Sequence, residues 1–304
     1  MKQVCMYAVL LAAVVSGCSS TEEGGLDNSE IRVGATVSGA ITKAPVVTGD
    51  TFKAAITAFE GSSDPSNWTS TPKWRNTITL VASETATGSS MPLDVSKVYP
   101  ATGNVYMAAW HPEIASESGV VTFQQTGTED VMYGGIVSGS KDVPVTKAFT
   151  FTHKLTQLNF QVQASTEYLK SNPDKKITKI EVIGAAYPKT MTIADGVVLY
   201  ESGATLPVPE VTTTALAEEV TKIGEPFMVQ SLNGVKVKVT YEGGTISKEI
   251  EIIDSSTKTL LNALAGNSHL ITLSFLKTGE VAIEGTATVA PWKTGASGNG
   301  TVTE

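Results

Sequence analysis

Short segments in which apolar and polar residues alternate recur along most of this chain, and clusters of Gly, Pro, Asn, Asp and Ser separate them. Alternation at every second residue is typical of a strand with one buried face. Long amphipathic runs that could form crossover helices between these segments are missing, which disfavours a parallel α/β sheet. The expected fold is therefore mainly β, with antiparallel sheets packed as sandwiches.

The pattern also predicts where the elements lie. The expected strands cover residues 31–41, 52–59, 77–82, 105–110, 149–151, 155–163, 177–183, 191–193, 227–229, 235–241, 246–253, 270–276 and 281–289. Residues 214–222 and 257–264 are expected to form short helices. Gly243 and Gly244 predict a tight hairpin turn between two strands. Residues 134–139, followed by a Val-Pro pair, predict a connection that ends at a domain boundary between residues 147 and 148.

The first residues of the chain have the order of an export signal. Lys2 supplies a positive charge, residues 4–15 are apolar, and the small residues Ser16 and Gly17 precede Cys18. The apolar run is too short to remain as a membrane span. This order resembles the lipobox of bacterial lipoproteins, in which the signal is removed before a cysteine that is then acylated. An ordinary secretory signal with an incidental cysteine is the alternative.

A lipobox would divide the N-terminal region into a signal peptide, residues 1–17, and a polar, acidic tether, residues 18–30. Acylated Cys18 would hold the protein at the outer membrane, on the cell surface. Cys5, the other cysteine, lies within the signal. The mature protein is therefore expected to have no disulfide, so that hydrophobic burial must stabilise it.

The charge of the chain limits its partners. The formal net charge is −8 at pH 7. A negative surface repels the phosphates of nucleic acids and the headgroups of anionic lipids. We therefore expect no nucleic-acid partner, and no attachment to the membrane other than the lipid.

The residues needed for common enzyme chemistry are sparse. His111, His153 and His269 are the three histidines, and none has metal-ligand spacing to another. Adjacent carboxylates occur in tether, turn or helix contexts, where solvation explains them. No nucleophile elbow and no phosphate-binding glycine loop occurs. We expect a protein that is not an enzyme and that holds no metal or cofactor.

Two tryptophans suggest a different function. Trp68 and Trp74 lie in a polar stretch that contains proline, where indole rings could stack on the faces of sugars. Coverage of the edge of a sandwich also explains these two residues, and the pattern favours that explanation. A monomeric glycan-binding surface lipoprotein is thus the alternative to the function that follows.

Five short blocks occur in an order that resembles one protein family. They are residues 99–112 (YPATGNVYMAAWHP), 130–134 (DVMYG), 149–162 (FTFTHKLTQLNFQV), 265–273 (AGNSHLITL) and 289–292 (VAPW). Together with the lipobox, these blocks resemble the fimbrillins, the pilin-like lipoproteins of Bacteroidetes. The resemblance covers nearly the whole chain.

The resemblance implies two tandem transthyretin-like β-sandwiches, which we place at residues 31–147 and 148–304. It also implies that subunits assemble into fimbriae by donor-strand exchange, after a protease removes an N-terminal strand. Other fimbrial subunits are then the expected partners, and a surface receptor is a further one. The expected function is that of a structural or accessory fimbrial subunit with a role in adhesion.

Two strands have matching patterns that fit such an exchange. One face of the first carries Ile31, Val33, Ala35, Val37 and Ile41, and one face of the second carries Val281, Ile283, Ala287 and Val289, with a glycine at 285. A groove fitted to one strand could accept the other, because backbone pairing is generic and alternate side chains fill the pockets. We expect the first to be displaced and the second to be donated. Two ordinary half-buried strands are the alternative.

Processing and the C-terminal tail raise separate questions. Lys43 lies just beyond the first strand and is one candidate cleavage site; Arg32 is another, although a cut there would leave most of the strand in place. The family's processing protease is typically arginine-specific, so Lys43 departs from the pattern. Residues 293–304 are rich in Gly and Ser and offer little further donor sequence. A tip, anchor or accessory subunit is therefore an alternative to a stalk subunit.

Overall fold

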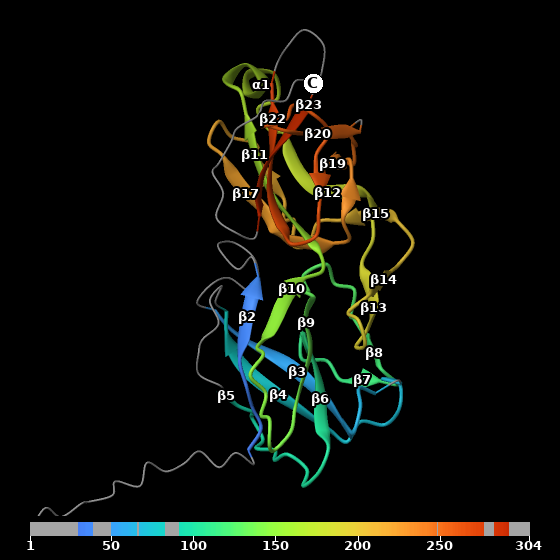
Figure 1. Ribbon diagram of the computed structural model, residues 1–304. Helices are drawn as coiled ribbons and strands as arrows, with labels where there is room; N and C mark the ends of the chain where they lie inside the picture. Colours follow the sequence, from blue (N-terminus) through green and yellow to red (C-terminus); the bar gives the residue numbers. More distant parts are fainter. Residues whose placement is uncertain are drawn as a thin grey trace, which may run out of the picture.

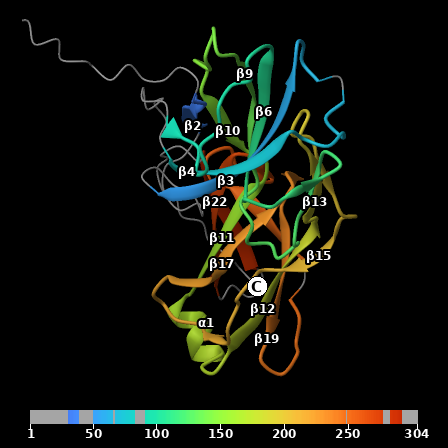
Figure 2. The same cartoon turned by 90° about the horizontal axis from the view of Figure 1, so that it is seen from below.

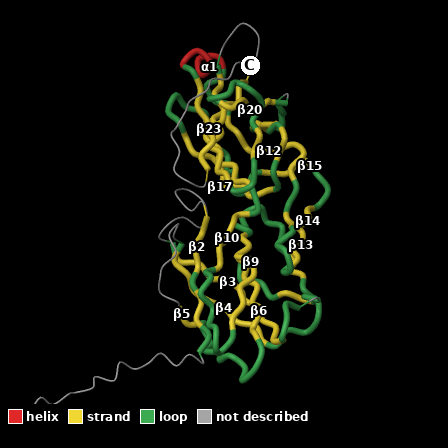
Figure 3. The backbone as a smooth tube through the Cα atoms, viewed as in Figure 1, coloured by secondary structure: helices red, strands yellow, loops and turns green. Residues whose placement is uncertain are grey.

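The computed structural model describes residues 30–38, 50–65, 67–82, 91–247, 249–276 and 283–291. Strands dominate these residues, and the helix α1 (Thr166–Ser171) is the single α-helix among them (Figure 3). The mainly β fold predicted from the sequence is confirmed.

A six-stranded sheet forms the part of the molecule drawn below in Figure 1. In spatial order its strands are β2 (Ala35–Ser38), β10 (Phe149–His153), β9 (Met132–Gly139), β6 (Asn104–His111), β3 (Thr51–Gly61) and β4 (Trp74–Val81). Neighbouring strands are antiparallel except for β2 and β10, which run parallel. The N-terminal segment thus occupies one edge of this sheet, and β4 occupies the other.

A nine-stranded sheet curls around the core of the part drawn above. In spatial order its strands are β15 (Ala204–Pro207), β12 (Lys176–Ala185), β19 (Lys236–Tyr241), β20 (Ile250–Asp254), β23 (Ile283–Pro291), β22 (Asn267–Phe275), β11 (Thr156–Ala164) and β17 (Thr221–Val229), with β16 (Thr214–Ala215) beside β12. Two of its pairs are parallel, β11 with β22 and β20 with β23. The remaining pairs are antiparallel, as expected.

Three small sheets complete the described structure. They are β1 (Arg32–Val33) with β5 (Met91–Pro92); β18 (Leu232–Asn233) with β21 (Asn262–Ala263); and the four strands β14 (Val198–Tyr200), β13 (Pro188–Thr192), β8 (Val120–Thr122) and β7 (Ser116–Glu117) in that order. The four-stranded sheet combines strands from before and after residue 148, because β13 pairs with β8.

Buried apolar side chains form three clusters. The first fills the space between the six-stranded sheet and the β1–β5 pair, and includes Phe149, Phe151 and Met107. The second lies inside the nine-stranded sheet. The third packs the other face of the six-stranded sheet against the four-stranded sheet, and it joins side chains such as Trp110 and Met191.

The expected boundary between residues 147 and 148 does not separate the sheets. β10 follows it in sequence and belongs to the six-stranded sheet, and it continues into β11 of the nine-stranded sheet (Figures 1 and 2). Contacts of β13 with β8 also cross it. The division into two tandem sandwiches accordingly stays a prediction.

Several local predictions are wrong. Residues 214–222 include β16 and the start of β17, and residues 257–264 include turns and β21, so neither is a helix. The stretch 134–139, expected as a connection, makes up most of β9. Gly134 allows close packing, because a Cβ there would lie 3.0 Å from the Phe151 ring. Gly135 has φ +82° and lies at a β-bulge, where the register between β9 and β6 shifts.

The hairpin at Gly243 and Gly244 is confirmed. Both residues have positive φ, and a backbone hydrogen bond of 3.0 Å from Gly244 to Tyr241 closes the turn between β19 and β20. The helix α1 was missed, although Ser165 gives a local signal. Its hydroxyl accepts a hydrogen bond from the Tyr168 N–H, which makes it an N-cap.

Candidate functional site

The N-terminal segment, residues 30–38, fills a slot along one side of the first core cluster. Its alternate residues Ile31, Val33, Ala35 and Val37 are at most 5% exposed and all belong to that cluster. The residues between them are partly exposed. The buried face that alternation predicts is therefore confirmed over residues 31–37. Ile41, expected on the same face, lies outside the described residues.

The backbone of this segment changes partner halfway. Before Gly34 it runs antiparallel to β5 and the residues after it: Val33 pairs with Met91, and the Ile31 N–H donates to the Lys97 carbonyl at 2.7 Å. After Gly34 it runs parallel to β10, where Ala35 pairs with Phe149. The Phe149 N–H donates to the Gly34 carbonyl at 2.8 Å, at the residue where the partner changes. The segment thereby bridges the two layers around the first core cluster.

Weaker polar contacts hold the outer face of the segment. Arg32 contacts the Glu30 carboxylate at 3.0 Å, and the Ser96 hydroxyl donates to the same carboxylate at 2.9 Å. The Thr36 hydroxyl donates to that of Thr150 at 3.4 Å. Exposed contacts of this kind contribute little to stability. The slot therefore depends on side-chain burial and backbone pairing.

The predicted processing and lipidation residues lie differently with respect to this slot. Arg32 is inside β1, paired with Pro92, so a cut beside it would fall within the paired strand. Lys43 and Cys18 lie outside the described residues. Their roles stay predictions.

The expected donor strand is β23, and it lies inside the nine-stranded sheet of its own chain. It pairs antiparallel with β22 over its whole length, from Ile283 opposite Phe275 to Pro291 opposite Asn267. On its other side it pairs parallel with β20. β2, in contrast, has one partner among the strands that the structure describes, β10. Releasing β23 would break pairing on both of its sides, whereas each half of residues 30–38 is paired on one side, β1 with β5 and β2 with β10.

The inward residues of β23 fit their own sheet closely. Gly285 and Ala287 are buried, two positions apart and therefore on one face. A Cβ at Gly285 would collide with Cδ1 of Ile252, a residue of β20. The small residues of β23 thus make room for neighbouring side chains. Of the other expected donor residues, Val281 and the side chains of Ile283 and Val289 are outside what the structure describes.

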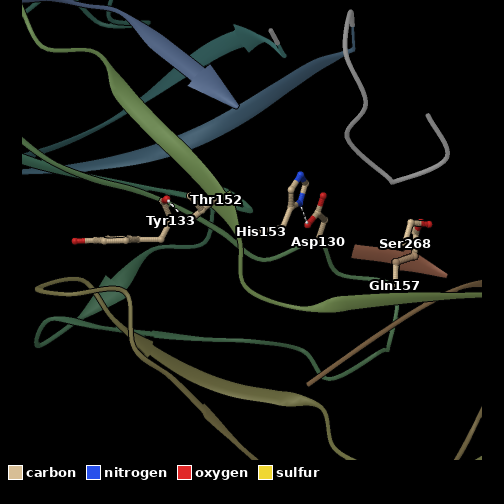
Figure 4. Close-up of polar contacts among 6 residues, drawn as sticks. All are labelled: Asp130, Tyr133, Thr152, His153, Gln157 and Ser268. Carbon is tan, nitrogen blue, oxygen red and sulfur yellow. Dashed lines mark hydrogen bonds and ion pairs between the residues drawn. The ribbon is translucent and has the colours of Figure 1, made fainter. Parts of the chain in front are cut away.

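A buried polar pair marks the end of the slot (Figure 4). Ser38 pairs with Thr152, and the next residue, His153, places Nδ1 2.8 Å from Oδ1 of Asp130. Both side chains are at most 1% exposed. Because a buried charge or polar group needs a partner, this pair fixes the junction at which β10 passes into β11.

A second polar pair follows along the same ribbon. The Ser268 hydroxyl donates to Oε1 of Gln157, and both residues are at least 94% buried. Figure 4 shows this pair beside Asp130 and His153, where β11 and β22 begin. Sequence reasoning missed both pairs, because their members are far apart in the chain.

The remaining histidines give no catalytic arrangement. His269 of β22 is fully buried, and burial lowers its pKa to about 4, so the ring is neutral at physiological pH. His111 ends β6, where Nδ1 contacts the Lys53 carbonyl at 2.7 Å. Within the described ranges, no group of three or more His, Cys, Asp or Glu residues could hold a metal ion.

The tryptophans proposed to contact glycans pack against the protein. Trp68 is 8% exposed and meets Phe59 edge-to-face, with ring centroids 5.0 Å apart, in the third core cluster. Trp74 begins β4 and packs, partly buried, on the first cluster. A ring that is buried in this way cannot stack on a sugar, so Trp68 has no surface for that role in this structure.

The chain is similar to known proteins in sequence and in fold. The model of a family described as fimbrillin-like matches residues 35–292. No match was found among curated proteins. In the part of the chain that the structure describes, there is no helix with the length and apolar character of a membrane span.

Solved structures match this chain over most of its length. A candidate cell adhesion protein from Bacteroides uniformis matches with a TM-score of 0.53 at 18% identity, over 87% of this chain and 99% of that one. The tip fimbrial protein Mfa3 from Porphyromonas gingivalis matches with a TM-score of 0.46 at 11% identity, over 87% and 99%. A fimbrilin, fimA, from the same species matches with a TM-score of 0.43 at 12% identity, over 90% and 99%. The first of these supports the fold.

Proposed function

Because this chain belongs to the fimbrillin-like family, we propose that it is a subunit of a cell-surface fimbria that receives a strand from a neighbouring subunit. The receiving site is the slot that residues 30–38 now fill. The observation that carries this proposal is the position of that segment, which combines a buried apolar face with an edge position along β2 among the described strands of its sheet.

The energetics favour replacement of the segment over its simple loss. Ile31, Val33 and Val37 together would stabilise the fold by about 5–9 kcal/mol, at about 1.5–3 kcal/mol for each buried side chain. Loss of the segment would also leave the edge of β10 and the apolar pockets open to water. An incoming strand with a similar face would restore both the burial and the ladder.

Processing and anchoring follow from the same proposal. We propose that a protease cuts beyond residue 38, at Lys43, and so frees the whole segment. Acylated Cys18 would hold the uncut protein at the outer membrane until then. The assembled subunit would take part in adhesion as a component of the fimbria.

A disulfide lock tests the proposal directly. Thr36 of β2 and Thr150 of β10 lie side by side, with their hydroxyl oxygens 3.4 Å apart, and replacing both by cysteine would tie β2 to β10. Under oxidising conditions, the Thr36→Cys/Thr150→Cys protein should fail to form multimers after protease treatment, and reductant should restore them. Thr36→Cys alone is the matched control. Multimers of the locked protein equal to those of the control would contradict the proposal.

A further inference from the structure

The slot and the expected donor strand differ in the order of their small residues. In the slot, one small residue, Ala35, lies between two valines, Val33 and Val37, and all three are buried. In β23, two small residues follow one another on the buried face, Gly285 and Ala287. Strand side chains point to one face at every second residue, so the two patterns can be compared position by position.

No register of β23 reproduces the pattern of the slot. If Ala287 takes the place of Ala35, Gly285 takes the place of Val33 and leaves that pocket without a side chain. If Gly285 takes the place of Ala35, Ala287 takes the place of Val37 and leaves that pocket half filled. A pocket in a packed core that is left unfilled loses both transfer free energy and dispersion contacts.

Gly285 and Ala287 fit the packing around β23 in the fold of this chain. Gly285 faces Ile252 so closely that a Cβ would collide with it, and Ala287 packs in the second core cluster. The sequence of β23 therefore suits its place between β20 and β22. Residues 292–304 do not supply the missing pattern, since Val302 is their one branched aliphatic residue.

From these observations we infer that the slot selects a strand of a different subunit over β23 of a second copy of this chain. This inference rests on the proposed function. The selected strand would carry branched aliphatic residues where Ile31, Val33 and Val37 now lie, and one residue no larger than alanine where Ala35 lies. In the fimbria, the slot of this chain would then hold a strand of a different protein.

Peptide competition in the full-length protein tests the inference. A recognition site for a sequence-specific protease is placed between residues 39 and 49, so that cleavage leaves residues 30–38 bound without a covalent link. A labelled peptide of residues 30–38 is then allowed to exchange into the slot. Competitors are a peptide of residues 282–290 and two variants of it, Gly285→Val and the outward-facing control Thr288→Val.

We expect the unmodified 282–290 peptide to compete at least ten-fold less well than the 30–38 peptide. Gly285→Val, which restores the order aliphatic, aliphatic, small, aliphatic, should recover most of that difference, and Thr288→Val should recover none. The inference would be overturned if the unmodified peptide competed as well as the 30–38 peptide. It would also be overturned if Gly285→Val improved competition no more than Thr288→Val did. A 30–38 peptide that cannot enter the slot at all would instead overturn the proposed function.

Discussion

Ala35 pairs with Phe149 in a parallel register, at the edge of the six-stranded sheet. This pairing makes β2 an edge strand whose side chains nevertheless reach the centre of a core. β23, at the other end of the described chain, has partners on both of its sides. The two strands resemble each other in sequence, yet β2 lies at an edge of its sheet whereas β23 lies between two partners.

Shortening a slot side chain should destabilise the fold. Ile31→Ala is expected to lower the free energy of unfolding by about 2–5 kcal/mol, because Ile31 is fully buried in the first core cluster. Thr36→Ala on the outer face of the same segment should change it by less than about 1 kcal/mol. Denaturant unfolding of both variants measures the difference. Equal effects would show that the segment does not contribute its apolar face to the core.

Removing the carboxylate beside His153 should also be costly. Asp130→Ala removes the hydrogen-bond partner of His153 Nδ1 in a buried site, and we expect a loss of about 1–3 kcal/mol in unfolding free energy. Asp142→Ala, at an exposed position, serves as the control and should have little effect. The measurement is thermal or denaturant unfolding at neutral pH. A loss no larger than that of the control would mean that the pair is not needed to hold the junction.

Acid should destabilise the protein through His269. Burial lowers the pKa of this residue from 6.5 to about 4, so between these pH values the unfolded state binds a proton that the folded state does not. Stability is therefore complete above pH 6.5 and falls by up to about 3 kcal/mol as the pH drops to 4. His269→Leu should remove this part of the pH dependence.

The control for that experiment is Ile271→Val, a fully buried position in the same strand. This variant should lower stability by about 0.5–1.5 kcal/mol at every pH and leave the acid slope unchanged. Unfolding free energies are measured between pH 4 and 7.5. An unchanged slope in His269→Leu would show that another group is responsible.

The fit of β23 to β20 can be tested by a double-mutant cycle. Gly285→Ala should destabilise the protein by about 1–3 kcal/mol, because the added methyl group meets Cδ1 of Ile252. Ile252→Val removes that atom, so the double variant should be more stable than the sum of the single effects predicts. Strictly additive effects would mean that the two side chains do not meet in solution.

The sequence predicts which face of a strand is buried better than it predicts which strands pair with one another. Alternation identified the buried side of residues 31–37, because burial depends on every second residue whichever strand lies alongside. It could not predict that the segment changes partner at Gly34, since backbone hydrogen bonding does not depend on side-chain type. For the same reason it could not place β23 between β20 and β22.

Glycine explains one of the wrong predictions. Residues 134–139 contain three glycines and were expected to form a connection, but in β9 these residues allow close packing on Phe151 and a bulge opposite β6. Asp130 and His153 are 23 positions apart, so their contact arises from the fold and has no local sequence signal. Trp68 was ambiguous for a similar reason, since an aromatic ring in a loop suits either a core or a ligand.

The N-terminus of this chain within assembled fimbriae tests the central proposal most directly. Fimbriae are isolated from the cell surface, and the first residue of this subunit is determined by mass spectrometry. We predict a chain that begins beyond residue 38, at Ala44, with the slot filled by a strand of another subunit. A chain that begins at acylated Cys18, with residues 31–37 intact in the assembled fimbria, would contradict strand exchange at this site.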